Sequence, residues 1–414
     1  MKQAFSNTQP DAPAARTSPT NALRGRLRQG NLGPVPVLIG LAVIAIVFQY
    51  FNQTFLTPVN LTNLLVQIAA VGTISIGVVL VLLLGEVDLS VGAVSGLSAA
   101  VMAVLSVKLG WPAPLAILCG IATGTVIGTV QGFWIANFRV PSFVVSLAGL
   151  LAWQGALLSV LGSTGTVNLT NKVIVGIANS RLPVWLGFAL AALGILGYAA
   201  VVLGEHRGRQ AAGLPVQPTT ILFGRIGLIA AATLVPVVLM SLNRNPNLDG
   251  PAVRGVPSAV VIFVTLLIVF DFITRRTRFG RYVYAVGGNI EAARRAGINV
   301  TRVRVAVFML CSTLAACGGI LAASRLYAVN QQSGGATELL NAIAAAVIGG
   351  TSLFGGRGRV WSSLLGILVI GAIANGMDLL ALSSAIKFMV TGTVLLLAVT
   401  LDASTRSRRE NTGR

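Results

Sequence analysis

The stretch LLLGEVDLSVG, residues 82–92, joins two apolar runs and carries two acidic residues, Glu86 and Asp88. Acidic residues are scarce in this chain of 414 residues, which has 11 of them against 30 Lys and Arg. Hydrophobic residues make up 55% of the chain and charged residues 10%, whereas soluble domains are usually about a quarter charged. The composition therefore predicts a polytopic membrane protein, with the acidic pair between two of its spans.

Apolar runs long enough to cross about 30 Å of hydrocarbon recur along the chain. The predicted fold is an all-α polytopic membrane protein with about twelve transmembrane helices. In "GIATGTVIG" (120–128), small residues at four-residue spacing favour tight helix contacts. The run at 339–352 is too short to span comfortably. The twelve runs are 34–51, 64–84, 91–107, 113–136, 142–161, 183–203, 226–241, 257–274, 304–325, 339–352, 360–380 and 384–402.

Basic residues are distributed unevenly between the two sides of these spans. With the N-terminus inside, the cytoplasmic segments hold 23 Lys and Arg and the outside loops hold 6. Because Lys and Arg are enriched in cytoplasmic loops, both termini are predicted in the cytoplasm. Without a crossing at 339–352 the basic C-terminal tail would lie outside, so the charge distribution favours a crossing there. The formal charge of +19 thus indicates cytoplasmic loops and no nucleic-acid partner.

The domain organisation follows from these spans. Residues 1–33 are polar and are predicted to be a disordered cytoplasmic tail. Residues 34–402 are predicted to form the transmembrane domain, and 403–414 a second cytoplasmic tail.

The sequence offers no constellation for catalysis, metal binding or a cofactor. None of the four lysines follows a Gly, so a Walker A motif, which needs Gly-Lys, is missing. His206 is the single histidine, and the three cysteines lack the spacing of a zinc site. The chain is predicted not to be an enzyme, and any ATP hydrolysis would fall to a partner.

The acidic pair has two interpretations. A carboxylate at mid-bilayer costs about 2.5–3.5 kcal/mol on insertion scales, so it is kept where it faces protein, water or a helix end. Asp88, followed by Ser90, can cap the helix that begins at Val91. Alternatively Asp88, Ser90 or Asn341 lines a translocation path and hydrogen-bonds to a solute. Of the two acidic residues, Glu86 is the one expected to reach headgroups or water, because it stands at the end of an apolar run.

An internal repeat is suggested by setting "GEVDLSVGAV" over "ELLNAIAAAV", which aligns Asp88 with Asn341. Without an extra helix pair at about 183–241, five spans remain on each side of it. An odd number of spans forces the two halves into opposite orientations. The sequence therefore predicts two inverted five-helix repeats, as in many transporters, plus an extra helix pair.

The longest basic segment, residues 275–304, contains "NIEAARRAGINV". Good helix formers begin at Glu291 and Gly297 stops them, so a short cytoplasmic helix is predicted. The run from Glu291 to Ile298 resembles the coupling loop of bacterial binding-protein-dependent ABC importer permeases, which docks in a cleft of the ATPase subunit. The resemblance assigns ATPase coupling to Asn289, Glu291, Ala292, Ala293, Gly297 and Ile298.

Three more stretches resemble the branched-chain amino acid and monosaccharide division of the same family, in the family's order. They are "GEVDLSVGAVSGL" (85–97), "ELLNAIAAAVIGGTSLFGGRGRVWSSLLG" (338–366) and "IANGMDLLALSSAIKFMVTGTVLLLAV" (373–399). The Asp-Leu-Ser-Val-Gly form at 88–92 is similar to that of ribose, arabinose and xylose permeases, and the extra helix pair is similar to the longer xylose type.

The resemblance implies a permease in the bacterial inner membrane that imports a pentose, D-xylose above others. Its implied partners are a cytoplasmic ABC ATPase subunit, a periplasmic sugar-binding protein and a second permease copy. Two alternatives remain open: a permease for a different monosaccharide, and an ion-coupled secondary transporter that uses Asp88 or Glu86. An intramembrane enzyme or a structural channel is the third class, which the missing catalytic constellation disfavours.

Overall fold

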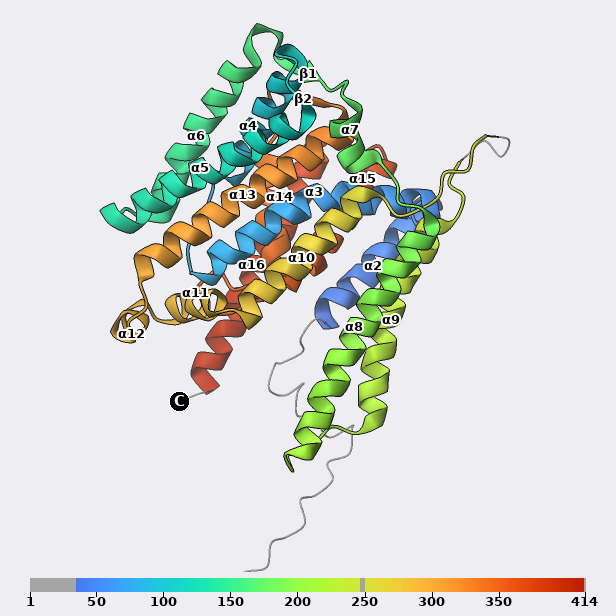
Figure 1. The fold of residues 1–414 in the computed structure, drawn as a ribbon, viewed down its shortest axis with the longest axis vertical. Coiled ribbons are helices and arrows are strands. Elements are labelled where there is room, and N and C mark those ends of the chain that lie inside the picture. The colour runs from blue at the N-terminus through green and yellow to red at the C-terminus, as the bar shows by residue number, and fades with distance from the viewer. Residues whose placement is uncertain (1–34, 246–249, 413–414) are drawn as a thin grey trace, which may run out of the picture.

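The fold is built almost entirely from helices (Figure 1). The structure, a computed structural model, describes residues 35–245 and 250–412. The predicted N-terminal tail, 1–33, lies outside the described residues. The strands of the described part are β1 (Thr166–Asn168) and β2 (Ala328–Asn330), which pair antiparallel with Val167 opposite Val329. The chain is an all-α polytopic membrane protein.

Twelve apolar helices correspond one by one to the twelve predicted spans. Within the described residues, nine are long and apolar enough to cross a membrane, and three more are shorter. The twelve helices are α2 (Val35–Phe51), α3 (Pro58–Leu83), α4 (Val91–Ala103) with the π-helical turn η1 (Val104–Lys108), α5 (Ala113–Phe138), α6 (Ser142–Leu161) with the 3-10 turn η2 (Gly162–Thr164), α8 (Val184–Ala211), α9 (Thr219–Ser241), α10 (Ser258–Arg276), α13 (Val300–Leu326), α14 (Ala336–Ile348), α15 (Trp361–Leu379) and α16 (Ser384–Thr412). The connecting helices are α7 (Lys172–Asn179), α11 (Arg278–Gly288) and α12 (Ile290–Arg295).

Three helices run further than the sequence suggests, and one is as short as predicted. Helix α8 continues to Ala211 and α9 begins at Thr219, so the basic loop expected at 204–225 is mostly helical. Helix α16 continues to Thr412, through most of the predicted tail 403–414. Helix α14 has 13 residues and rises about 20 Å, which is less than the hydrocarbon thickness of about 30 Å.

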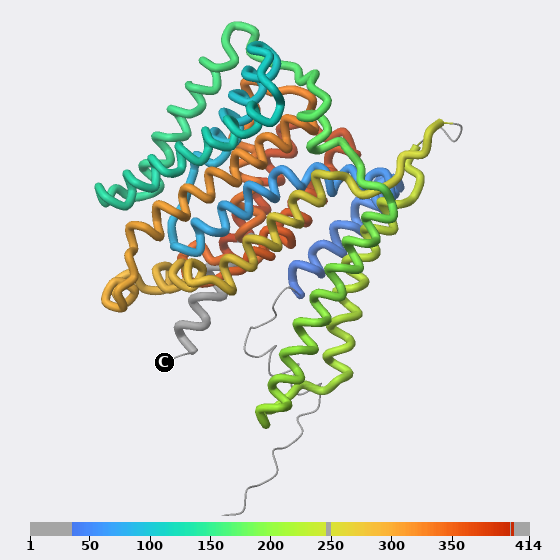
Figure 2. Tube along the Cα trace, viewed as in Figure 1, coloured from blue at the N-terminus to red at the C-terminus, as the bar shows by residue number. Residues whose placement is uncertain are grey.

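Helix α13 lies at the centre of the bundle and packs against α3, α4 and α5 (Figures 1 and 2). Glycines of α5 form much of this contact. A Cβ at Gly124 would lie 2.5 Å from the Ser312 carbonyl oxygen, and one at Gly128 would lie 2.4 Å from that of Phe308. The close contacts predicted from the four-residue spacing of small residues are therefore confirmed: Gly124 and Gly128 contact α13, and Gly120 lies closest to α4.

Helices α3 and α13 pack antiparallel. Gly77 of α3 approaches Cys311, while Gly318 of α13 approaches Ile74, so one helix descends as the other ascends. Together with α4 they contribute many of the buried residues of the main hydrophobic core.

The short helices α4 and α14 have 13 residues each and similar surroundings. Helix α4 packs on α13 and on the next two helices of its own half, α5 and α6. Helix α14 packs on α3 and likewise on α15 and α16. Each short helix thus contacts a long helix of the opposite half: α4 contacts α13, and α14 contacts α3. This symmetric arrangement is consistent with a repeat of the two five-helix halves.

The residue alignment within that repeat was wrong. Asp88 precedes α4, whereas Asn341 lies inside α14, so the helix starts do not place them at equivalent positions. Near the start of α4, a Cβ at Gly92 would lie 2.7 Å from the Gly334 carbonyl oxygen and 3.2 Å from Leu339 Cβ. The starts of the two short helices therefore meet in the interior, although Asp88 and Asn341 are not counterparts.

The extra helix pair, α8 and α9, packs on the bundle through its own small apolar cluster. This cluster consists of Ala191, Val237, Met240 and Val256, with Leu65, Val260 and Val261 against it. A second contact between the pair and the bundle is an ion pair of 3.2 Å between Glu205 of α8 and Arg276 of α10. The predicted extra pair is therefore attached to the bundle at two places.

The glycine contacts of α5 yield a stability prediction. We expect Gly128→Leu to lower the unfolding free energy by about 1–3 kcal/mol, since overpacking forces side chains and backbone to shift. Thermal unfolding of the purified protein in detergent measures the effect. The matched control is Gly194→Leu on α8, where a Cβ meets nothing within 4 Å. Equal stability of the two variants would contradict the close packing of α5 on α13.

Candidate functional site

The segment from Leu84 to Ser90, between α3 and α4, is held inside the protein by neighbouring helices. Gly85 has a φ of +76°, a left-handed conformation that allows the chain to turn directly after α3. The backbone N–H of Val87 donates to Ser142 Oγ of α6 at 3.4 Å. The acidic segment is therefore fixed by α6 as well as by the two helices it connects.

Glu86 lies buried, with 9% of its surface exposed, and is paired with a cation. Its Oε1 lies 2.7 Å from Nε of Arg304, on the second turn of α13. The expectation that Glu86 reaches headgroups or water was wrong. The carboxylate can remain inside because the guanidinium of Arg304 compensates for part of its lost hydration. The sequence did not indicate this partner, because Arg304 lies far from Glu86 along the chain.

Asp88 is buried and forms a small polar network. Its Oδ1 accepts the backbone N–H of Ser90 at 2.8 Å, and the Ser90 hydroxyl lies 2.7 Å from the same oxygen. That hydroxyl is also 3.0 Å from Oε1 of Gln131 on α5. Asp88 therefore stabilises the turn before α4 and accepts no N–H from within the helix, while Ser90 is the N-cap residue without a side-chain cap bond.

Three buried polar atoms beside this network have no hydrogen-bond partner among the described residues. They are Asp88 Oδ2, Gln131 Nε2 and Trp153 Nε1. Two of these atoms lie next to Gly149 of α6, because a Cβ there would lie 2.3 Å from Gln131 Nε2 and 3.0 Å from Trp153 Nε1. We call Asp88, Ser90, Gln131 and Trp153 the polar cluster.

The polar cluster combines an acceptor with two kinds of N–H donor. An unsatisfied buried polar group costs about 1–3 kcal/mol, so three together call for a ligand or water as partner. Hydroxyl groups both donate and accept, and they fit such a mixed set. The sequence indicated Asp88 and Ser90. Gln131 is one of several polar residues within the predicted spans, and no local pattern distinguishes it or Trp153.

Asn341 is not part of the polar cluster. It lies half-buried in α14, and among the described residues no hydrogen bond joins it to Asp88, Ser90 or Gln131. Of the three residues predicted to line a path or cap a helix, the structure thus brings two together.

A short helix does occupy the predicted coupling loop. Helix α12 begins after Asn289, whose side chain accepts the backbone N–H of Ala292 at 2.9 Å. It is terminated by Gly297, with a φ of +80°. The next helix is capped in the same way, since Asn299 accepts the N–H of Arg302 at 2.9 Å. The helix and its glycine stop are confirmed, whereas the two asparagine caps went unnoticed in the sequence.

The predicted coupling residues divide into an exposed and an anchoring set. Asn289, Glu291, Ala292 and Gly297 are exposed. Ala293 is buried, and Ile298 packs against the core. Glu291 is paired with Arg294 at 2.7 Å on the outer face. Helix α12 therefore offers a free surface while its inner face is fixed to the bundle.

A cluster of glycines connects α11 and α12 to the acidic segment. A Cβ at Gly287 would lie 1.8 Å from the Leu83 carbonyl oxygen, which accepts the N–H of Gly356 at 2.9 Å. A Cβ at Gly355 would lie 2.7 Å from the Gly287 oxygen and 2.8 Å from Gly85 N. We call Gly85, Gly287, Gly355 and Gly356 the glycine junction. Through it, a displacement of α11 would press directly on the base of the segment that carries Glu86 and Asp88.

Comparison with known proteins gives a consistent result. The family described as "Branched-chain amino acid transport system / permease component" matches residues 60–399. The chain is 38% identical over 376 residues to the xylose transport system permease protein XylH of Escherichia coli, covering 90% of this chain and 93% of that protein.

Two further relatives cover similar lengths. XylH of Haemophilus influenzae is 35% identical, over 92% of this chain and 99% of the relative. The ribose import permease protein RbsC of Bacillus subtilis is 34% identical, over 90% and 92%. No solved structure matches the chain significantly.

The buried ion pair yields a second prediction. We expect Glu86→Gln and Arg304→Gln each to destabilise the protein by about 1–3 kcal/mol, because each leaves a charged group buried without its partner. The double variant should be less destabilised than the sum of the two. Thermal unfolding of the three variants measures the coupling. Arg302→Gln is the control, since Arg302 is exposed two residues away; additive losses would mean that the pair is not formed.

Proposed function

Because the chain belongs to the family of permease components of branched-chain amino acid transport systems, we propose that it is the membrane-spanning permease of an ATP-driven sugar importer. The cargo we propose is a pentose, D-xylose. Two relatives with the highest identities given above are xylose permeases by name, and a ribose permease follows them. The alternative cargo is another monosaccharide.

The polar cluster is the observation that carries the proposal. Its free groups, Gln131 Nε2, Trp153 Nε1 and Asp88 Oδ2, are buried within the membrane-spanning bundle and offer hydrogen bonds. An uncharged sugar is matched by such a mixture of donors and acceptors better than by a ring of like charges. In the proposal the cluster forms part of the translocation path, and Asp88 additionally fixes the turn before α4.

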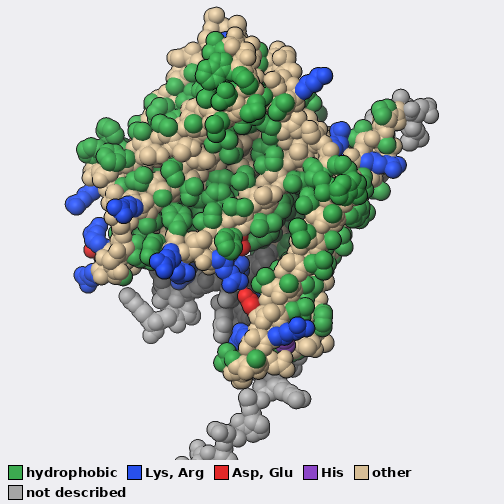
Figure 3. Space-filling view, in the orientation of Figure 1, with side chains coloured by type: hydrophobic (Ala, Val, Ile, Leu, Met, Phe, Trp, Pro, Cys, Tyr) green, Lys and Arg blue, Asp and Glu red, His purple; other side chains and the backbone are tan. Residues whose placement is uncertain are grey.

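We assign the end of the molecule that carries α12 to the cytoplasm, together with both termini. The side chains of Lys and Arg gather at this end of the surface view (Figure 3), which suits the enrichment of basic residues on the cytoplasmic side. The inner bacterial membrane is then the location. A periplasmic sugar-binding protein would approach the opposite end, at β1 and β2, and a second permease copy would complete the path.

The ATPase partner supplies the energy in this proposal. The chain itself has no Gly-Lys pair for a Walker A motif, and α12 presents Glu291 and Ala292 to solvent. The ATPase would dock on this surface, and its nucleotide state would move α11 and α12. The glycine junction would pass the movement to the acidic segment, so that each partner biases one of two states of the path through its differential affinity.

Reconstitution tests the proposal. The chain is placed in proteoliposomes with a candidate ATPase and a pentose-binding protein, and uptake of labelled xylose is followed with and without ATP. We expect uptake to require ATP and both partners. Ala292→Arg should reduce uptake at least tenfold by blocking the docking surface, whereas Ala211→Arg, at the exposed end of α8, should leave it unchanged. Uptake by the chain alone, driven by an ion gradient, would overturn the importer assignment.

The role of Asp88 separates the importer from an ion-coupled transporter. Asn retains an oxygen that accepts the Ser90 N–H, but it cannot take up or release a proton. We therefore expect Asp88→Asn to retain at least a third of ATP-dependent uptake, and Asp88→Leu to abolish most of it. Uptake rates at saturating and limiting sugar measure both. Complete loss in Asp88→Asn, with normal folding, would favour the ion-coupled alternative.

A further inference from the structure

A cavity of about 440 Å³ lies at the α12 end of the molecule, apart from the polar cluster. It lies between the end of α10, helix α11 and the loop after α14. We call it the arginine pocket. Its lining residues are Thr274, Arg275, Arg281, Tyr284, Gly358 and Arg359.

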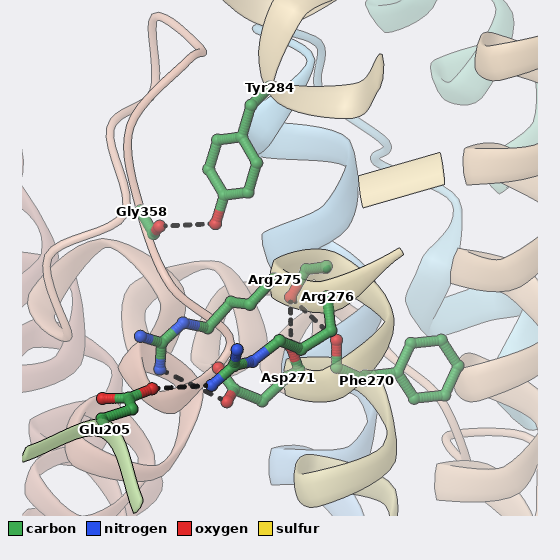
Figure 4. Close-up of polar contacts among 8 residues, drawn as sticks. Glu205, Phe270, Asp271, Arg275, Arg276, Tyr284 and Gly358 are labelled. Atoms are coloured by element: carbon green, nitrogen blue, oxygen red, sulfur yellow. Dashed lines mark hydrogen bonds and ion pairs between the residues drawn. The ribbon is translucent and has the colours of Figure 1, made fainter. Parts of the chain in front are cut away.

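The wall of the arginine pocket is built from firm contacts (Figure 4). The Tyr284 hydroxyl donates to the Gly358 carbonyl oxygen at 2.9 Å, joining α11 to the loop. Burial, to which the negative charge of Asp271 adds, raises the pKa of Tyr284 above its usual value, so this hydroxyl stays protonated. Thr274 Oγ1 donates to the Phe270 carbonyl oxygen at 2.8 Å within α10.

The charges around the arginine pocket do not cancel. Arg275 has a carboxylate partner in Asp271, at 3.6 Å. The neighbouring Arg276 is matched by Glu205, at 3.2 Å, outside the lining (Figure 4). Arg281 and Arg359 line the cavity and have no ion pair or hydrogen bond from their side chains within the part of the chain that the structure describes. Arg281 and Arg359, both exposed, are therefore two cationic residues of the lining without an anionic partner among the described residues.

The surroundings of the arginine pocket match the boundary between hydrocarbon and water. Helix α10 is an apolar span that ends in Arg275 and Arg276. Two large aromatic side chains close in sequence to lining residues are exposed, Phe272 on α10 at 61% and Tyr282 on α11 at 41%. Aromatic and basic side chains together are typical of the headgroup level of a membrane.

We propose that the arginine pocket binds the headgroup phosphate of an anionic phospholipid, with Arg281 and Arg359 as its main ligands. Guanidinium groups bind phosphate oxygens bidentately, and basic pockets between transmembrane helices on the cytoplasmic side are suited to anionic headgroups. The bound lipid bridges α11 and the loop 349–359, which both contribute to the glycine junction. The lipid thereby stabilises the position of α11, which leads directly into α12. This inference does not depend on which sugar is transported.

Native mass spectrometry of the full chain, released from nanodiscs, tests the proposal. The discs contain either phosphatidylcholine alone or phosphatidylcholine with phosphatidylglycerol. We expect one phosphatidylglycerol to be retained per chain, and Arg281→Gln/Arg359→Gln to reduce its retention at least tenfold. The matched control is Arg207→Gln/Arg209→Gln, which removes the same charge from exposed positions at the same end, outside the pocket.

Three outcomes would overturn the proposal. Equal retention of phosphatidylglycerol by the pocket variant and the control would show that the attraction is not local. Binding of inorganic phosphate to the chain in phosphatidylcholine discs, with no preference for phosphatidylglycerol, would make a free anion the ligand. Unchanged lipid retention by the pocket variant, together with lost co-purification of the ATPase, would assign the arginines to the protein partner.

Discussion

The structure depends first on the close approach of α13 to the helices around it. The approach is possible because the contact positions lack side chains: Gly124 and Gly128 on α5, Gly77 on α3, and Gly319 on α13, where a Cβ would lie 2.0 Å from the Ser95 carbonyl oxygen. In a bilayer the hydrophobic effect does not hold helices together, so dispersion contacts between closely packed backbones must do so. With α13 in place, α3, α4 and α5 have fixed positions, and the polar groups between them are fixed too.

The acidic segment relies on that frame. Glu86 can remain inside the protein because Arg304 is on α13, and Asp88 reaches Gln131 through Ser90 because α5 packs beside α4. A charge and a polar network of this kind are costly when partly satisfied. Their presence in a protein whose charged residues are only 10% of the chain is the reason that the acidic segment was proposed as part of the path.

The bundle also connects two surfaces of different character. Helix α12 is exposed on its outer face, while α11 contacts the acidic segment and the loop 349–359 at positions where only glycine fits. Stiff backbone contacts of this kind transmit a displacement with little loss, since packed interiors are nearly incompressible. The arginine pocket is lined partly by α11, so the proposed lipid site, the proposed docking surface and the acidic segment all adjoin this helix.

The sequence by itself determined the features that depend on local patterns. The apolar runs predicted all twelve helices, the spacing of small residues in 120–128 predicted close packing, and Glu291 to Gly297 predicted α12, because burial in lipid and helix termination act over a few residues. Only the tertiary structure decided which groups meet. Two meetings depend on helices distant in sequence: Arg304 with Glu86, and Gln131 with Ser90 and Asp88. The physical reason is that a buried charge or hydrogen bond is satisfied by whichever group the packing brings within about 3 Å, and no local pattern records that choice.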